Sequence, residues 1–429
     1  MRLWTSTFRQ SQLGSLGSNY IRCGLDSIEC GVSRRLPSAK ALHIQTLPKT
    51  LGHSRCRPQP ARQSCSPPTR RLYCNPAAAV NGAPSFAFAF DIDGVLLRSS
   101  TPIPGAAKAL TYLHNNNIPF ILLTNGGGKY ESARVAELTD KLGVPLSEDN
   151  FVQSHTPFKQ LVGGYDGIEA LKDKTIMVTG GDGDKCRKVA ERYGFKNVII
   201  PGDILMDNPT IWPFSQVFTD YYQKIHRPLP RPVDLADPAK SLKIDAIFVF
   251  NDPRDWALDS QIILDLLSSK QGILGTYSDK NGDTSLPNNG WQQDGQGGFQ
   301  ASLRGVWDVT TGGAKLERTV IGKPHAETYK YAENVLNTYR THLLGAGTKG
   351  KPVGRLQRVF MVGDNPESDI RGANDYESAH DTKWTSCLVK TGVFREGTKP
   401  AYAPKVIVDD VLSAVKWALK SEGWKGDVP

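Results

Sequence analysis

The chain has 429 residues, of which 39% are apolar and 9% aromatic, so it is long enough for two globular domains and an extension. Its formal charge is +9, but residues 1–83 hold ten Arg and two Lys against only Asp26 and Glu29, which leaves a net charge of −1 for the rest. This near-neutral body argues against a nucleic-acid-binding protein, and the lack of any run of about 18 apolar residues argues against a membrane-spanning helix.

The basic segment at 1–83 is rich in Ser and poor in acidic residues, and it resembles a mitochondrial targeting segment. The sequence Arg71-Leu72-Tyr73 resembles the cut site of matrix processing peptidases, so we expect a mitochondrial protein with the matrix as its compartment. A disordered basic tail without targeting value is the alternative. Five of the seven cysteines lie in or at the edge of this segment, so no disulfide framework is predicted.

From residue 84 onward, short apolar runs alternate with segments of helical periodicity, which predicts an α/β fold with a parallel sheet and crossover helices. Strands are predicted at 86–90, 119–124, 175–179, 197–200, 246–250, 319–321 and 358–362. Helices are predicted at 106–114, 131–142, 185–193, 259–267, 325–343 and 412–420. Three stretches interrupt this rhythm and are predicted to be loops, at 207–243, 278–298 and 345–354.

Two carboxylates directly follow the first predicted strand. Because alternate side chains of a strand point to the same side, Asp91 and Asp93 can face one cleft, and Gly94 allows a sharp turn after them. Clustered carboxylates repel one another, and a divalent cation removes that repulsion. The pair predicts an aspartyl nucleophile with an acid/base partner, and an ordinary Asp-Gly turn is the alternative.

Polar side chains also follow three other predicted strands. The hydroxyl of Thr124 and the amide of Asn125 follow one strand and precede the small residues 126–128, which let backbone N–H groups approach an anion. The compact positive charge of Lys323 follows another strand. The acid Asp364 follows a third, with Asp369 five positions later.

The four motifs, in this order and each after an apolar strand, resemble the haloacid dehalogenase superfamily over nearly all of residues 84–429. The resemblance implies a Rossmann-like core with a parallel sheet and an aspartyl-phosphate mechanism. Asp91 would attack phosphorus, and Asp93 would protonate the leaving oxygen and later activate water. Because dehalogenase members lack the second acid, Asp93 favours phosphoryl transfer to water.

The resemblance also implies phosphate-binding residues and metal ligands. Thr124, the backbone at Asn125, and Gly126 would hold phosphoryl oxygens after the second strand. Lys323 would also bind the phosphoryl group and would neutralise its charge. Mg²⁺ would be held by two carboxylates and one backbone carbonyl, from Asp91, Asp364 and Asp93 respectively. Asp369 would lie behind these ligands and orient Lys323 or a water.

Motif spacing locates an inserted cap. Asp91 and Thr124 are 33 positions apart and Thr124 and Lys323 are 199 apart, so the insertion lies between the second and third motifs. This placement resembles class IIA, whose α/β C2-type cap folds over the cleft and selects the substrate. We expect the core at 84–164 and 316–429 and the cap at 165–315.

Within class IIA, the stretches 124–128, 363–370 and 384–393 are most similar to the cat-eye-syndrome critical-region branch, whose members are mostly mitochondrial. The leading hypothesis is a Mg²⁺-dependent phosphatase that hydrolyses a small phosphorylated metabolite in mitochondria. One alternative is a binding or regulatory protein that keeps the fold with little or no catalysis. Another is a soluble phosphatase connected to glycerophospholipid metabolism. We expect no nucleic-acid partner, no transmembrane segment and, by resemblance alone, a homodimer.

Two weaker patterns are not predicted to form sites. Residues 345–351 nearly match a phosphate-binding loop, but Pro352 stands where Ser or Thr must reach Mg²⁺, and no strand precedes them. His155, His325 and His380 lack the spacing of zinc ligands, and each is expected to be a capping or surface residue.

Overall fold

The computed structural model describes residues 2–6, 84–214, 217–234, 236–281, 283, 298–316, 318–345 and 354–428. Most of the basic segment and most of the predicted loops at 278–298 and 345–354 therefore lie outside the described residues. The described residues form two parallel sheets and one small antiparallel hairpin, β3 (Leu97–Arg98) with β4 (Thr101–Pro102). The predicted α/β class is confirmed.

The first sheet has six parallel strands in the order β13-β12-β11-β2-β5-β6. These strands are β2 (Phe86–Phe90), β5 (Phe120–Leu123), β6 (Phe151–Val152), β11 (Arg358–Gly363), β12 (Lys383–Val389) and β13 (Val406–Val408). β2, β5 and β11 agree with predicted strands. β6 and β13 were not predicted because two or three residues carry too little periodicity, and β12 was missed because polar residues interrupt its apolar run.

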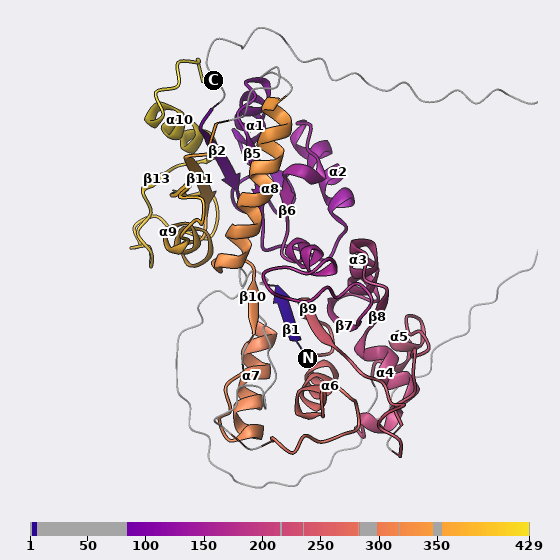
Figure 1. The fold of residues 1–429 in the computed structure, drawn as a ribbon. Helices are drawn as coiled ribbons and strands as arrows, with labels where there is room; N and C mark the ends of the chain where they lie inside the picture. The colour runs from indigo at the N-terminus through magenta and orange to yellow at the C-terminus, as the bar shows by residue number, and fades with distance from the viewer. Residues whose placement is uncertain are drawn as a thin grey trace, which may run out of the picture. The chain divides into compact units, whose positions relative to one another are not determined.

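Alternation along β2 places helices on both faces of this sheet. Phe86, Phe88 and Phe90 pack with residues of α1, α2 and α10, whereas Ala87 and Ala89 pack with residues of α8 and α9. Figure 1 shows α8 alongside β2 and β5. Because the alanine face is shallow, large side chains from the helix can approach the sheet closely. The helices are α1 (Ala106–Asn115), α2 (Glu131–Leu142), α8 (Ala326–Gly345), α9 (Arg371–Asp375) and α10 (Val411–Ser421).

The second sheet has five parallel strands in the order β10-β1-β9-β7-β8. They are β1 (Arg2–Ser6), β7 (Thr175–Gly181), β8 (Asn197–Ile199), β9 (Ala246–Pro253) and β10 (Thr319–Ile321). β1 was not predicted, since residues 1–83 were expected to be a targeting segment or a disordered basic tail, and no strand was expected in either. β7, β8 and β9 lie within 165–315, where the cap is expected, whereas β10 lies just beyond it, in the stretch expected to belong to the core. The borders of the cap stay a prediction.

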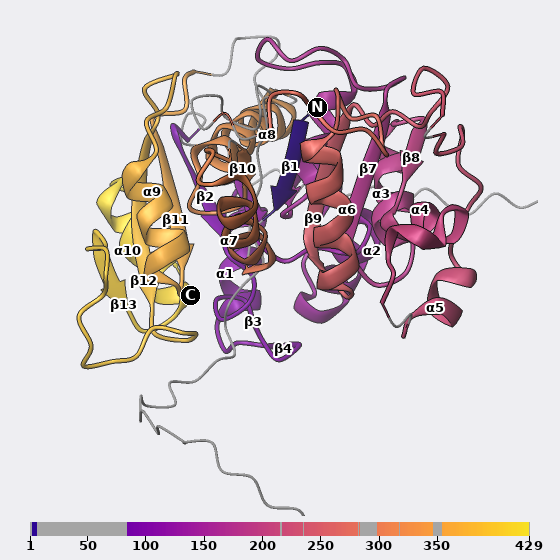
Figure 2. The same ribbon diagram turned by 90° about the horizontal axis from the view of Figure 1, so that it is seen from below.

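Helices also cover both faces of the second sheet. Along β9, Ala246, Phe248 and Phe250 pack with residues of α3, whereas Ile247 and Val249 pack with residues of α4, α6 and α7. Figure 2 shows α6 running across β9. The helices are α3 (Lys185–Tyr193), α4 (Pro201–Asp207), α5 (Thr219–Gln223), α6 (Trp256–Ser268) and α7 (Gly298–Thr311). The short α4 and α5 and the helix α7 were not predicted.

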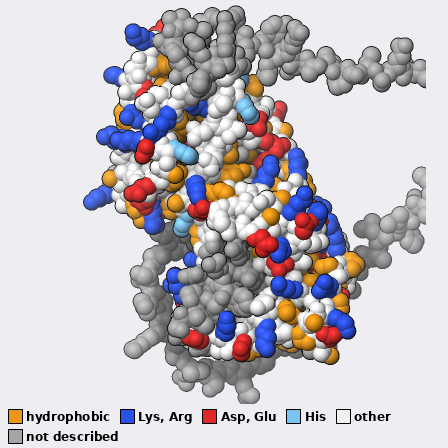
Figure 3. All heavy atoms as spheres, viewed as in Figure 1, with side chains coloured by type: hydrophobic (Ala, Val, Ile, Leu, Met, Phe, Trp, Pro, Cys, Tyr) orange, Lys and Arg blue, Asp and Glu red, His pale blue; other side chains and the backbone are white. Residues whose placement is uncertain are grey.

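The described surface has no single dominant charge on the face that Figure 3 shows, where Lys and Arg side chains lie intermixed with Asp and Glu. This matches the near-neutral charge of the chain after residue 83. Within the described ranges, no helix combines the length and apolar character needed to cross a membrane.

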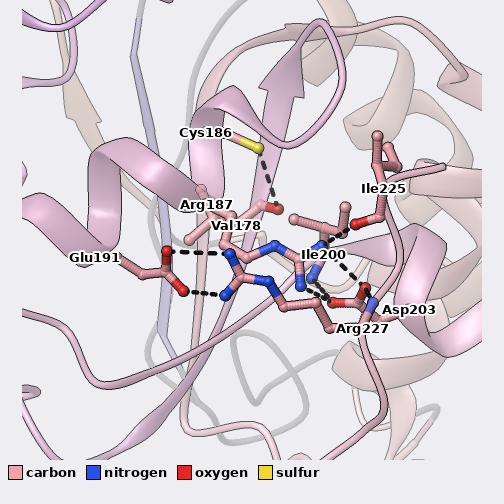
Figure 4. Close-up of polar contacts among 8 residues, drawn as sticks. All are labelled: Val178, Cys186, Arg187, Glu191, Ile200, Asp203, Ile225 and Arg227. Atoms are coloured by element: carbon pink, nitrogen blue, oxygen red, sulfur yellow. Dashed lines mark hydrogen bonds and ion pairs between the residues drawn. The ribbon is translucent and has the colours of Figure 1, made fainter. Parts of the chain in front are cut away.

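A buried ion pair joins α3 to α4 (Figure 4). The guanidinium of Arg187 donates to both carboxylate oxygens of Asp203, at 2.8 and 3.0 Å, and to the carbonyl oxygen of Ile225 at 2.7 Å. Arg187 and Asp203 are each 1% exposed. Beside them, Arg227 pairs with Glu191, and both of those side chains are partly exposed. The two pairs therefore share chemistry but differ in burial.

This difference generates a stability prediction. Asp203→Asn leaves the Arg187 guanidinium buried without its counter-charge, and we expect it to lower the free energy of unfolding by about 3–5 kcal/mol. Glu191→Gln is the matched control, because it breaks a solvent-screened pair and should change the free energy by about 1 kcal/mol or less. Urea unfolding followed by circular dichroism measures both. Equal losses of unfolding free energy in the two variants would contradict the prediction that the buried pair contributes more to stability than the partly exposed one.

Asp259 on α6 is a buried acid that should make the stability of the protein depend on pH. Burial raises the pKa of its carboxyl to about 7, although the hydroxyl of Thr179, which donates to it, acts in the opposite direction. Since the folded pKa lies above the unfolded one, folding favours the protonated form. The stabilisation is complete below pH 4 and is lost as the pH rises through 7.

We therefore expect Asp259→Asn, which keeps a neutral side chain of the same shape, to flatten this pH dependence. The variant should have a higher melting temperature than the wild type at pH 8 and no such advantage at pH 4.5. Thermal unfolding at the two pH values tests this, with the exposed Asp140→Asn change on α2 as control. The same difference in melting temperature between variant and wild type at both pH values would show that Asp259 is not the source of the pH dependence.

Candidate active site

The nucleophile candidate lies at the carboxyl end of β2, in the middle of the first sheet. The backbone N–H of Asp91 donates to the carbonyl oxygen of Val362 at 3.0 Å, so the chain is still held by β11 where the acid begins. A tight turn follows, in which Gly94 has a φ of 83° and its N–H donates to Leu97 at 2.6 Å. Asp91 is buried and Asp93 is half-buried. The turn therefore gives the two acids different exposure to water.

Lys323 is the cation of the site. It follows β10, and its Nζ lies 3.0 Å from Oδ1 of Asp91 and 2.7 Å from Oδ1 of Asp369, and it donates to the carbonyl oxygen of Leu123 at 2.7 Å. An ammonium carries a positive charge and three N–H donors, and these three oxygens lie within 3.0 Å of it. The lysine therefore bridges two buried carboxylates that would otherwise repel each other.

Asn125 holds the backbone of Lys323 in place. Its side-chain oxygen accepts from the N–H of Lys323 at 2.7 Å, and its side-chain nitrogen donates to the carbonyl oxygen of Lys323 at 2.9 Å. The predicted role of Asn125 was phosphate binding by its backbone, and no role was predicted for its side chain. The structure gives that side chain a clear one, because the amide clamps the main chain of a residue 198 positions away.

Thr124 and the glycines after it form the candidate phosphate-binding turn. The N–H of Gly126 donates to Oγ1 of Thr124 at 3.0 Å, which folds the loop back over the end of β5. Thr124 and Asn125 are buried, whereas Gly126 to Gly128 are half-exposed. The loop therefore presents backbone rather than side chains at the end of the strand, which suits the approach of an anion.

Three carboxylates form a group with metal-ligand spacing. Asp91, Asp364 and Asp369 are all buried, and each offers an oxygen within 4.8 Å of the others. With one lysine among three carboxylates, the group carries a net charge of −2, and oxygen ligands with excess negative charge fit a hard divalent cation. The side chain of Asp93 is not in this group. Its expected contribution was the backbone carbonyl, and Asp369 was expected behind the ligands rather than among them.

Two glycine-containing turns enclose Asp364. A Cβ added to Gly94 would lie 2.4 Å from Oδ2 of Asp364, and one added to Gly392 would lie 1.8 Å from the same atom. The N–H of Val393 donates to that oxygen at 2.7 Å, and the hydroxyl of Thr391 donates to the carbonyl oxygen of Gly94 at 2.6 Å. The turn after β12 therefore fixes one carboxylate oxygen and the turn that follows the nucleophile. Residues 384–393 carry a family resemblance in the sequence, but no site role was predicted for them.

We expect Gly392→Ala to displace the Asp364 carboxylate and to weaken divalent metal binding about 10- to 100-fold, as changes beside metal ligands do. Isothermal titration with Mg²⁺ measures this directly. Gly163→Ala is the control, because its Cβ would meet no atom within 4 Å. Unchanged Mg²⁺ affinity in a folded Gly392→Ala protein would show that Asp364 does not hold the metal.

A cavity of about 450 Å³ adjoins the glycine turn, which comprises residues 126–129. On one side it is lined by residues 127–129, and on the other by turns at the carboxyl ends of β7 and β9 and by the start of α6. Asp252 lies in this lining, and burial raises the pKa of its carboxyl. The cavity places polar groups of the second sheet next to the candidate phosphate-binding turn.

The prediction for His155 was wrong as to the surface, because this residue is 0% exposed. It does stand at the N-cap position of the 3₁₀ helix Thr156–Val162, but its side chain makes no capping hydrogen bond. Instead, its Nε2 accepts from the N–H of Gly128 at 3.2 Å. Its other nitrogen lies 2.7 Å from the hydroxyl of Tyr193. No spacing rule could have found this role, because it joins the glycine turn to a tyrosine on α3.

Two family models match the chain, a haloacid dehalogenase-like hydrolase over residues 88–196 and a HAD-hydrolase-like model over residues 320–414. A Schizosaccharomyces pombe protein named cardiolipin synthase (CMP-forming) / mitochondrial hydrolase fusion protein is 41% identical over 345 residues, which are 77% of this chain and 53% of that protein. The Saccharomyces cerevisiae mitochondrial hydrolase YKR070W is 40% identical over 360 residues, which are 78% of this chain and 95% of that protein. The chain thus spans about half of the first relative and nearly all of the second. The structure of a hypothetical protein, PH1952, from Pyrococcus horikoshii gives a TM-score of 0.46 at 20% identity, covering 78% of this chain and 99% of that one.

Proposed function

The chain belongs to the haloacid dehalogenase-like hydrolase family, and we propose that it is a Mg²⁺-dependent phosphatase that hydrolyses a small phosphomonoester through an aspartyl-phosphate. The observation that carries this proposal is the bridge from Lys323 to Asp91 and Asp369 beside Asp364. It combines a buried nucleophile, a fixed cation and a candidate metal group at one end of one sheet. The position of the insertion supports class IIA as the subgroup.

The chemistry proceeds in two displacements at phosphorus. An oxygen of Asp91 attacks phosphorus, the bond from phosphorus to the ester oxygen breaks, and Asp93 gives its proton to the leaving oxygen. Asp93 then takes a proton from water, whose oxygen attacks phosphorus, and the bond to Asp91 breaks to release inorganic phosphate. The half-exposure of Asp93 supports this role, because an acid that also activates water must reach solvent.

Charge stabilisation comes from groups that the fold holds in place before the reaction. The Nζ of Lys323, 3.0 Å from Asp91, neutralises charge on the nucleophile and on the transferring group. Thr124 and the backbone of Asn125 and Gly126 hold phosphoryl oxygens. Mg²⁺, held by Asp91, Asp364 and the backbone carbonyl of Asp93 with Asp369 behind them, would supply the remaining positive charge.

The proposed location is the mitochondrion, with the matrix as the compartment. The basic segment at 1–83, with its net charge of +10, supports a targeting role. The names of the two yeast relatives, which both contain the words mitochondrial hydrolase, support the same location. A homodimer is a further expectation, which measurement of the molecular mass in solution would test.

A second candidate function is a phosphatase that acts on a head-group ester in glycerophospholipid metabolism. It is favoured by one observation, that the name of the S. pombe relative joins a mitochondrial hydrolase to a cardiolipin synthase. The same nucleophile and acid would serve this reaction, since only the leaving group differs. The panel of substrates in the experiment below therefore includes a lipid phosphomonoester.

We expect the purified full-length chain to release inorganic phosphate from at least one compound in a panel of sugar, polyol and nucleoside monophosphates, p-nitrophenyl phosphate and a lipid phosphomonoester in vesicles. EDTA should abolish release and Mg²⁺ should restore it. Asp91→Asn should abolish turnover, and Asp93→Asn should lower it about 10²- to 10⁴-fold while leaving the melting temperature unchanged. The exposed Asp140→Asn change on α2 is the control and should behave as wild type.

A folded chain that binds Mg²⁺ but releases phosphate from none of these compounds would contradict the phosphatase proposal. That outcome would favour the binding or regulatory protein instead. Turnover confined to the lipid substrate would favour the glycerophospholipid alternative.

A further inference from the structure

The segment that follows β6 fixes the glycine turn at several points. We define the glycine turn as residues 126–129 and the bracing segment as residues 153–156. Each contact involves a different residue of the turn, so the turn is held along its length and not only at its ends. The contacts are Ser154 N to Gly126 O (3.1 Å), Gly128 N to His155 Nε2 (3.2 Å) and Gln153 Nε2 to Lys129 O (2.8 Å).

His155 is the member of the bracing segment that continues into a longer hydrogen-bonded chain. Its Nδ1 lies 2.7 Å from the hydroxyl of Tyr193, and that hydroxyl donates to the carboxylate of Glu131. Thr156 also donates to the same carboxylate oxygen, at 2.9 Å. Tyr193 is the last residue of α3, which packs on the second sheet, and Glu131 is the first residue of α2, which packs on the first. The chain therefore connects elements of both sheets.

The donors and acceptors along this chain have one consistent direction. The backbone N–H of Gly128 can only donate, so Nε2 of His155 must accept and carries no proton. The proton of the neutral ring then lies on Nδ1 and is donated to Tyr193, which in turn donates to Glu131. The carboxylate of Glu131 can only accept hydrogen bonds, so through Tyr193 it favours the His155 tautomer that has its proton on Nδ1.

Burial and packing keep this imidazole neutral and immobile. Burial lowers the pKa of His155 to about 4, although the negative charge of Glu131 acts in the opposite direction. The ring stacks on Phe250 of β9, with the ring centroids 5.2 Å apart and an interplanar angle of 25°. A Cβ added to Gly127 would lie 3.0 Å from Cδ2 of His155, so the backbone of the glycine turn lies directly against the ring.

We propose that His155 is a positioning residue, which, through Tyr193 and Glu131, fixes the glycine turn in the geometry that receives the phosphoryl group and couples that geometry to the placement of α3. The inference rests on the proposed function, since the turn matters as a phosphate-binding element. His155 itself does not touch the reacting atoms in this role. It acts through the backbone of Gly128, the residue two positions after Gly126.

The coupling follows from where Tyr193 is anchored. Because the hydroxyl belongs to α3, a displacement of that helix moves the acceptor of the His155 proton and loosens the hold on Gly128. Phosphate affinity should then depend on the second sheet even though none of its residues needs to contact the phosphoryl group. This is a positional effect, and misplacement of a reacting group by about 1 Å can cost about 10²-fold in rate.

Tyr193→Phe is the sharpest test, because it removes one hydroxyl from the chain and leaves the glycine turn and the imidazole intact. We expect the dissociation constant for inorganic phosphate, measured by calorimetry with Mg²⁺ present, to rise about 10-fold, and KM for p-nitrophenyl phosphate to rise with it while kcat changes less. Tyr222→Phe is the matched control. It removes the hydroxyl of a second tyrosine, which is buried, packs on the second sheet and donates to Asp255 at 3.1 Å.

A second pair of variants guards against simple loss of packing. His155→Gln can place an amide oxygen near the position of Nε2 and accept from Gly128, whereas His155→Leu fills the space without an acceptor. We expect Gln to retain more phosphate affinity than Leu at similar melting temperatures. Equal affinities in these two variants, or equal affinities in Tyr193→Phe and Tyr222→Phe, would overturn the positioning role and leave the phosphatase proposal standing. A wild-type chain that neither binds nor releases phosphate would overturn both.

Discussion

The rest of the site depends on the ion pairs that the ammonium of Lys323 makes with two aspartates. The ammonium lies between the carboxylates of Asp91 and Asp369, both buried, and without it the third acid, Asp364, would join a cluster of uncompensated negative charge. Burying charges is unfavourable unless their partners are already in place. The parallel sheet satisfies this condition, because β2, β5 and β11 all end at one edge and deliver acids, hydroxyl and amide to the place that the lysine reaches.

The parts of this arrangement that follow from local pattern could be predicted from the sequence. The runs that form β2, β5 and β11 are strongly apolar, and the polar residues directly after them can be recognised as candidate site residues by that position. The two faces of β2 were also implicit, since Phe and Ala alternate there with a period of two. The family resemblance added chemical roles that spacing alone does not supply, and the comparisons confirm the family.

What could not be predicted depends on contacts between distant residues. The linear motif suggests a phosphate-binding role only for the backbone at Asn125, and nothing in it indicates that the side-chain amide binds the main chain of Lys323. His155 has no informative neighbours in sequence, and its environment arises only when α3 and β9 pack against it. β1 is a similar case, because five residues of a basic segment carry no strand signal until they pair with β9 and β10. In each case the partner lies far away in the sequence.

The clamp between Asn125 and Lys323 has a consequence for how such a protein can change over evolutionary time. The amide holds main-chain atoms, so it fastens Lys323, which follows a strand of the second sheet, to the end of β5 in the first sheet, whatever lies between β6 and β10. Lengthening such an excursion adds only about 0.6 kcal/mol of closure entropy for each doubling. The stretch between β6 and β10 can therefore be exchanged, shortened or extended, and new specificities can be acquired without rebuilding the chemistry at its base.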